Sequence, residues 1–293
     1  MNLKLFKEIC KFSEGELLDI MTKFLKSRYD KVIATSDYII AEGDLPVALL
    51  AHLDTVGVRP PSDIYFDSKA HIMWSPQLLG ADDRAGVYAI TEIVQEGYRP
   101  SIILTTAEES GCLGALYLAD EHPECPIKNL KALIQLDRQG KNDSVYYECD
   151  NKRFKKFINS YGFNTAQGSF SDISVLGPAY QIAAVNLSVG YLNEHNPIET
   201  LNIKWLSETI EKVKRIIVDI DSYPAFEYIR AENSPNMFQW LSYASRNYSA
   251  LPVEDPPVPA EETCAFCQAP LGKDKVLCPD GFSICQKCFS EFY

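Results

Sequence analysis

Acidic and histidine side chains recur in this 293-residue sequence at the ends of apolar, strand-like runs. The three clearest runs span residues 47–51, 101–107 and 132–136. The side chains that follow them are His52, Asp54, Glu108, Glu109 and Asp137. Ligand sites of open α/β sheets lie beyond the carboxyl ends of the strands, so we expect these side chains to meet at one edge of a sheet.

His52 and Asp54 are spaced so that one can orient the other. Residues i and i+2 of a strand share a face, so Asp54 can accept the second ring N–H of a metal-bound His52. Such a pair on its own is more typical of an ordinary surface loop, so its meaning depends on the other motifs.

Two acidic pairs have more specific uses. Asp82 and Asp83 open a predicted helix, where adjacent acids repel each other unless a cation or a helix N-cap uses them, and both interpretations stay open. A carboxylate at this position could also bridge two metals through its two oxygens. Of Glu108 and Glu109, one could bind a metal while the other serves as a base.

With His195 added from the segment 193–199, the sequence offers two histidines and three carboxylates as ligands, with acids to spare. Mixed nitrogen and oxygen ligands suit zinc, with cobalt or manganese as replacements. Two metals about 3.5–4 Å apart that share a carboxylate form a two-metal hydrolytic site.

Five short motifs stand in the order HLDTV, GADDRAG, EESG, LD and EHNPIE. This order resembles the co-catalytic dizinc exopeptidase superfamily, which includes peptidase T-like tripeptidases, glutamyl and leucyl aminopeptidases, carboxypeptidases and deacylases. The resemblance covers roughly residues 1–222. It implies that Asp82 bridges two zinc ions, because the bridging acid of the family stands two residues before the basic residue, here Arg84. The other roles it implies are His52 and Asp137 at one zinc, Glu109 and His195 at the other, Glu108 as general base, and Asp54 as the partner of His52.

The function implied by the resemblance is hydrolysis of an amide bond by a metal-activated water, with an aminopeptidase acting on peptides as the leading prediction. One alternative is a deacylase or amidase that acts on a non-peptide or modified substrate. Another is a non-catalytic binding protein that keeps the fold, against which the complete ligand set and the retained Glu108 argue. No residue identifies the group that would hold a substrate's free α-amine or terminal carboxylate.

The sequence departs from the family in one respect. Peptidase T-type and carboxypeptidase members carry an extra domain between the last acidic ligand and the final histidine. Asp137 and His195 are only 58 residues apart, and predicted core elements use most of this interval. Little room is left for an independent domain, which usually exceeds about 50 residues. We therefore expect a bare catalytic domain.

Apolar periodicity predicts alternating helices and strands. Helices are predicted at residues 14–27, 84–96, 113–120, 154–161 and 205–220, and further strands at residues 31–34, 38–41, 145–149 and 182–189. The alternation predicts a three-layer α/β/α fold with a mixed, mostly parallel central sheet. Residues 168–173 resemble a helix start that lies near the substrate in the family, and a simple N-cap at Ser171 or Asp172 is equally open.

The 28 Lys+Arg and 40 Asp+Glu residues give a formal net charge of −12. This acidity argues against a nucleic-acid partner, which requires clustered basic residues. No apolar run is long enough for a membrane span, and the N-terminal residues lack the apolar stretch of a signal peptide. We expect a cytoplasmic protein, in which clustered cysteines bind metal more often than they form disulfides.

The last 30 residues hold five of the nine cysteines. Cys264 and Cys267 form one CxxC pair and Cys285 and Cys288 another, with 17 residues between them, which fits a zinc ribbon with one structural zinc and Cys278 as a spare thiol. Metal would supply the folding energy of so short a segment. It either caps the catalytic domain or docks a protein partner, and both remain open. The predicted domains are a catalytic domain at residues 1–225, a partly helical and then Pro-rich acidic linker at 226–263, and the four-cysteine zinc module at 264–293.

Overall fold

A computed structural model describes residues 1–57, 59–232, 276–277 and 283–284. The chain divides into two units, residues 1–245 and 246–293. In the second unit, the described strands β13 (Val276–Leu277) and β14 (Ser283–Ile284) pair antiparallel. The four predicted zinc ligands, the spare thiol and most of the predicted linker lie outside the described residues, so the zinc module stays a prediction. The ligands are Cys264, Cys267, Cys285 and Cys288, and the spare thiol is Cys278.

The first unit is built on a sheet of eight strands in the order β1-β2-β6-β3-β7-β10-β8-β9. The central strands β6, β3, β7 and β10 run parallel, whereas β1, β2 and β8 join their neighbours β2, β6 and β10 antiparallel. The predicted mixed, mostly parallel sheet is thus confirmed. The strand bounds are β1 (Lys31–Ala34), β2 (Tyr38–Glu42), β3 (Leu45–His52), β6 (Pro100–Thr105), β7 (Ala132–Arg138), β8 (Asp143–Val145), β9 (Asn164–Ala166) and β10 (Ala184–Ser188).

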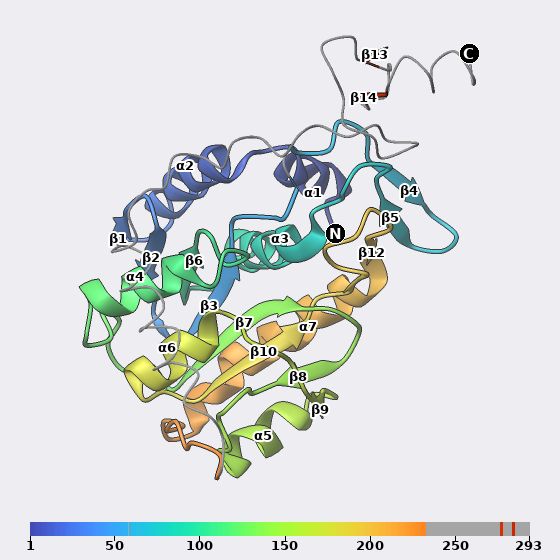
Figure 1. The fold of residues 1–293 in the computed structure, drawn as a ribbon. Helices are drawn as coiled ribbons and strands as arrows, with labels where there is room; N and C mark the ends of the chain where they lie inside the picture. Colours follow the sequence, from blue (N-terminus) through green and yellow to red (C-terminus); the bar gives the residue numbers. More distant parts are fainter. Residues whose placement is uncertain (58, 233–275, 278–282, 285–293) are drawn as a thin grey trace. The chain divides into compact units, whose positions relative to one another are not determined.

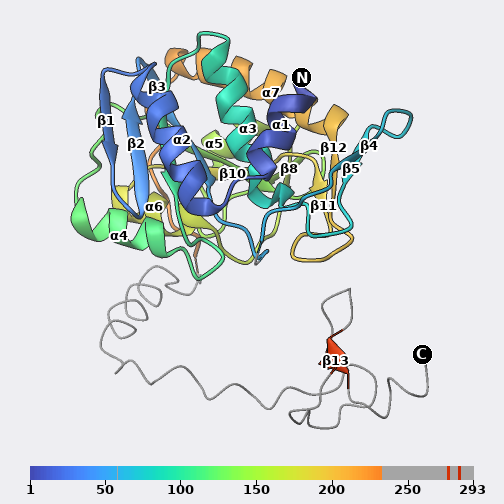
Figure 2. The same cartoon turned by 90° about the horizontal axis from the view of Figure 1, so that it is seen from above.

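Helices cover both faces of this sheet, as the alternating side chains of the strands show. On β3, Leu49 packs into one hydrophobic cluster, whereas Ala48 and Leu50 pack into the other. The larger cluster lies beneath α1 (Leu3–Cys10), α2 (Glu14–Lys26), α3 (Ala81–Gln95), α5 (Lys152–Asn159) and α7 (Ile203–Asp219). The other lies beneath α4 (Leu113–Glu121) and α6 (Asp172–Tyr180). Burial on both faces explains why the central strands are apolar throughout, and the three layers can be followed in Figures 1 and 2.

A second sheet has the order β11-β12-β5-β4 and was not predicted. Its strands β4 (Tyr65–Asp67) and β5 (Ile72–Trp74) form a hairpin, and β12 (Thr200–Asn202) joins β5 to β11 (Tyr191–Leu192). Helix α1 was also missed. The predicted strand at 145–149 is wrong beyond Val145, because Tyr147 has a positive φ of 51° that ends the extended backbone.

The predicted absence of an inserted domain is confirmed. Between Asp137 and His195 the chain forms only α5, α6 and strands of the two sheets. Phe226 is buried in the core of the first unit, so described residues after the predicted boundary at 225 still pack with it. Among the described residues, no helix is long and apolar enough to cross a membrane.

Candidate metal centre

His52 ends strand β3 at the carboxyl edge of the sheet, between β6 and β7. Its Nδ1 lies 3.1 Å from Oδ1 of Asp54. Asp54 also accepts the backbone N–H groups of Glu108 and Glu109, each at 3.0 Å. Burial raises the pKa of Asp54, but His52 and these N–H groups outweigh it and hold the pKa below its ordinary value. One ionised carboxylate therefore orients the imidazole and anchors the loop after β6.

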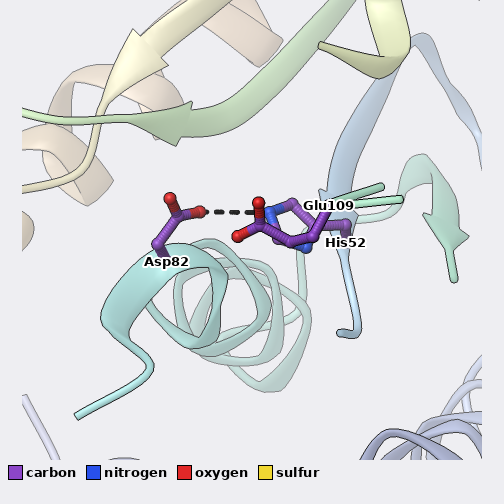
Figure 3. Close-up of side chains that lie close together, drawn as sticks. All are labelled: His52, Asp82 and Glu109. Carbon is purple, nitrogen blue, oxygen red and sulfur yellow. Dashed lines mark hydrogen bonds and ion pairs between the residues drawn. The ribbon is translucent and has the colours of Figure 1, made fainter. Parts of the chain in front are cut away.

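Asp82 lies at the start of α3 and presents its two oxygens to two different histidines. Oδ1 is 3.1 Å from Nε2 of His52, and Oδ2 is 3.2 Å from Nε2 of His195. Figure 3 shows Asp82 pointing from the helix toward His52 and Glu109. Asp83 is engaged with backbone instead, since Oδ1 accepts the N–H of Gly86 at 2.9 Å and Oδ2 the N–H of His52 at 3.3 Å. This arrangement suits Asp82 to bridge two cations and Asp83 to cap the helix.

Asp137 projects from β7 on the other side of His52. Its Oδ1 lies 3.5 Å from Nε2 of His52, and its Oδ2 accepts the hydroxyl of Ser171 at 2.8 Å. The backbone N–H of Asp137 is held by Oδ1 of Asn186 on the neighbouring strand β10. Ser171 is also the N-cap residue of α6, so the 168–173 motif both starts a helix and borders the site.

Glu109 and His195 face each other on loops. Nε2 of His195 lies 2.9 Å from Oε1 of Glu109 and forms an ion pair with it when the imidazole is protonated. An imidazole nitrogen and a carboxylate oxygen this close can share a proton or bind one metal ion. Glu108 is buried beside them, with Sγ of Cys112 at 3.8 Å from its Oε1.

The buried carboxyl groups of the centre are destabilised in their ionised form unless a proton or a cation lies next to them. Burial raises the pKa of Glu108 well above its ordinary value and that of Glu109 to about 7. Burial also raises the pKa of Asp137, and the charge of Asp82 adds to this effect. The contact with Asp82 raises the pKa of His195 to about 9. Clustered, buried carboxylates of this kind bind either protons or metal cations.

Two groups of side chains have ligand atoms within 4.8 Å of one another: His52, Asp82 and Glu109, and His52, Asp83 and Asp137. Their nitrogen and oxygen donors fit zinc. The second group contains Asp83 in place of the predicted Asp82, and neither group contains His195, so the assignment of ligands to two ions stays a prediction. His71 is exposed and outside the cluster, and His122 instead lies 3.1 Å from the hydroxyl of Tyr38.

Two acids beside the centre were missed or left without a role. Asp172 is buried behind Asp137, and its Oδ2 accepts the hydroxyl of Thr105 at 2.5 Å. Glu199 is buried against the backbone of residues 80–82. Glu199 stands in the EHNPIE motif, but nothing in a linear sequence shows which distant N–H groups a carboxylate will reach.

Residues 33–175 match the model of Peptidase family M28. The chain is a metallopeptidase. The predicted resemblance to the co-catalytic zinc exopeptidase superfamily is therefore confirmed, and the metallopeptidase carries a candidate metal site at the carboxyl edge of its sheet. No curated protein matches the chain.

Solved structures share the fold of the metallopeptidase at low sequence identity. A tripeptidase from Staphylococcus aureus subsp. aureus Mu50 has a TM-score of 0.61, and aminopeptidase PepT from Bacillus cereus ATCC 10987 has 0.59; each is 16% identical and covers 75% of this chain and 98% of its own. The TET aminopeptidase from Thaumarchaeota archaeon SCGC AB-539-E09 has a TM-score of 0.55 at 16% identity, covering 73% of this chain and 95% of its own.

Proposed function

We propose that the metallopeptidase is an aminopeptidase that binds two zinc ions, for which cobalt or manganese can substitute. Asp82 would hold both ions. His52 and Asp137 would complete one site, the inner position, and Glu109 and His195 would complete the other, the outer position. The strongest support is that the two oxygens of Asp82 face one histidine from each position.

Zinc held by these residues would lower the pKa of a water to about 7 and would stabilise negative charge on the substrate. Glu108 would serve as the base that takes a proton from the attacking water and gives it to the leaving amine. Its buried carboxyl is suited to hold a proton between the two steps, because burial favours the neutral form. Asp54 fixes the tautomer of His52 and holds the backbone of Glu108.

We propose peptides with a free α-amine as substrates, because similar structures are described as aminopeptidases and a tripeptidase. We further propose a cytoplasmic location, which the free thiols of Cys10, Cys112, Cys125 and Cys149 support. For residues 264–293 we retain the proposal of one structural zinc held by four cysteines. Deleting residues 250–293 separates its two roles: loss of folding indicates a cap, whereas loss of activity on large substrates alone indicates docking.

The catalytic proposal is tested by comparing Glu108→Gln with its neighbour Glu109→Gln. We expect Glu108→Gln to keep two zinc ions and lose about 10²–10⁴-fold in kcat. Glu109→Gln should instead lose zinc from the outer position. Glu42→Gln, which removes a surface carboxylate paired with Lys31, is the matched control and should keep both zinc and activity.

The assay uses aminoacyl, peptidyl-carboxylate and N-acyl substrates with zinc-loaded protein, so that a deacylase can be recognised. Hydrolysis confined to N-acyl substrates would replace the aminopeptidase proposal. Near-normal turnover by a fully metallated Glu108→Gln variant would remove Glu108 from the proposed role. Absence of any chelator-sensitive hydrolysis would favour a binding protein.

A further inference from the structure

The carboxylate of Glu199 does not face the metal centre but holds the backbone of the bridging ligand. Its side chain is buried, with an exposed fraction of 1% for the residue. Oε2 accepts the N–H of Gly80 at 2.6 Å, and Oε1 accepts the N–H of Asp82 at 3.0 Å. The N–H of Ala81, which lies between them in the chain, also acts to lower the pKa of this carboxylate. Three successive N–H groups thus converge on one carboxylate.

This carboxylate accepts the first N–H groups of helix α3, ahead of the cap that Asp83 gives to the N–H of Gly86. The N-cap position is Gly80, in the left-handed conformation, and glycine has no side chain to accept the first N–H groups of the helix. In most helices a Ser, Thr, Asp or Asn at that position accepts them. Here the acceptor comes from more than a hundred residues away in the sequence.

Asp82 depends on such an external acceptor because its own backbone is not helical. Its φ of −81° and ψ of 105° place it outside the hydrogen-bonded helix, although the helix continues after it. The direction of the Asp82 carboxylate is therefore set by what holds the backbone of residues 80–82. Among the described residues, Glu199 supplies the side-chain acceptors of that segment.

Glu199 also belongs to the loop that carries His195. The N–H of Glu199 donates to the carbonyl of Asn196 at 2.9 Å and closes a turn after the histidine. Strand β12 follows at once and fixes the end of this loop by pairing with β5. One short loop therefore carries the outer ligand His195 at one end and, at the other, Glu199, which accepts the backbone N–H of Asp82.

We propose that Glu199 is a positioning residue that sets Asp82 against His195 and thereby sets the metal affinity of the outer position. This inference rests on the proposed function, since it requires two metal positions. His52 and Asp137 are instead positioned by β3 and β7. Loss of the Glu199 carboxylate should therefore weaken the outer position more than the inner one.

The test is a stepwise zinc titration of chelator-treated full-length protein, followed by calorimetry against a competing chelator. In Glu199→Gln an amide NH₂ replaces one acceptor and opposes a backbone N–H. We expect the weaker of the two zinc affinities to fall about 10–100-fold, as for other residues that support ligands, and the tighter to change less than about threefold. Asn151→Ala is the control, because it removes a buried N-cap from α5, away from the centre.

Thermal unfolding accompanies each titration, and Glu199→Asp is a second variant that keeps the charge but shortens the reach. Equal weakening of both positions, or no weakening, in a folded variant would overturn the inference. If neither variant folds, the role of Glu199 is structural and the inference is also wrong. If the wild type does not bind two zinc ions, the proposed function is wrong. If the wild type binds two zinc ions but Glu199→Gln shows no selective effect, only the role of Glu199 is wrong.

Discussion

The proposed inner and outer positions would use similar ligands, but the protein supports these residues differently. His52 and Asp137 belong to adjacent parallel strands, and the side chain of His52 is 1% exposed. Glu109 and His195 lie on loops, and the side chain of His195 is 50% exposed. The sheet register fixes the inner pair directly, whereas the outer pair depends on hydrogen bonds between loops, chiefly those accepted by Asp54 and Glu199.

This difference shows which ligands are held by the core and which by loop contacts. The inner ligands share the hydrophobic core, so a change that damages them should also damage folding. The outer ligands are attached to that core by a few carboxylate–amide contacts, so a change there should affect metal binding with little cost in stability.

The largest effect is expected from replacing each histidine by asparagine. His52→Asn should destabilise the fold by about 3–5 kcal/mol, because it removes the partner of several buried carboxylates. His195→Asn should cost less than about 1 kcal/mol, because the side chain is half exposed and Asn tolerates its left-handed backbone. Both variants should lose turnover.

Urea unfolding of chelator-treated protein measures the stability difference, and bound zinc is counted by mass spectrometry. His71→Asn is the control, since His71 is exposed, also has a positive φ and lies outside the centre. Equal destabilisation by the two site variants would contradict the distinction between an inner and an outer position.

The same distinction explains what the sequence could predict. The ligand-bearing strands β3, β6 and β7 were predicted because they are buried on both faces and therefore read as continuous apolar runs. Asp137 and His52 could be placed at one edge by that reasoning alone. The pairing of Glu109 with His195 depended on family resemblance, because no periodicity specifies how two loops meet.

Other features could not be predicted for related reasons. The hairpin of β4 and β5 has strands of only three residues, too short to show alternation. Helix α6 contains Pro178, which argues against a helix in a linear reading, and its N-terminal half is held by contacts with β7 through Gln135. The role of Glu199 depends on a contact across more than a hundred residues, which local rules do not reach.

A second prediction concerns Gly86, where α3 touches the strand of an inner ligand. A Cβ atom added to Gly86 would overlap the carbonyl oxygen of Leu136 and the carboxylate of Asp83. Gly86→Ala should therefore cost about 2–3 kcal/mol of unfolding free energy and weaken zinc at the inner position, because β7 must shift. Gly15→Ala in α2 is the control; its Cβ meets nothing within 4 Å and should stabilise by about 0.5–1 kcal/mol. An unchanged free energy of unfolding in Gly86→Ala would show that α3 and β7 can move apart more easily than proposed.

A third prediction concerns Asp172, the buried acid behind the inner position. Burial raises its pKa to about 7, whereas an unfolded Asp titrates near 4. Between these values the folded state binds the proton and the unfolded state does not, so stability falls as pH rises from about 4 to 7. Asp172→Asn removes this loss. The stability of the variant relative to wild type should improve by about 1–3 kcal/mol between pH 5 and pH 8.

Urea unfolding of the chelator-treated proteins at both pH values checks this expectation, with the exposed Asp63→Asn as the control. A constant difference between variant and wild type would show that Asp172 is ionised throughout. The inner position would then lie next to an additional ionised carboxylate. The proposed difference in support between the inner and outer positions would be smaller.

The smallest effect is expected at Ile198, three residues after His195 on the outer loop. Its exposed fraction is 65%, whereas Ile134 on β7 is fully buried. Ile198→Ala should change the free energy of unfolding by less than about 0.5 kcal/mol, and Ile134→Ala should cost about 2–5 kcal/mol. If urea unfolding showed that Ile198→Ala lowers the free energy of unfolding by more than about 1 kcal/mol, the loop would pack against the core and would not be held by the hydrogen bonds of Glu199 alone. The outer ligands would then be held by the core as firmly as the inner ones, and Glu199→Gln should lose its selective effect on zinc.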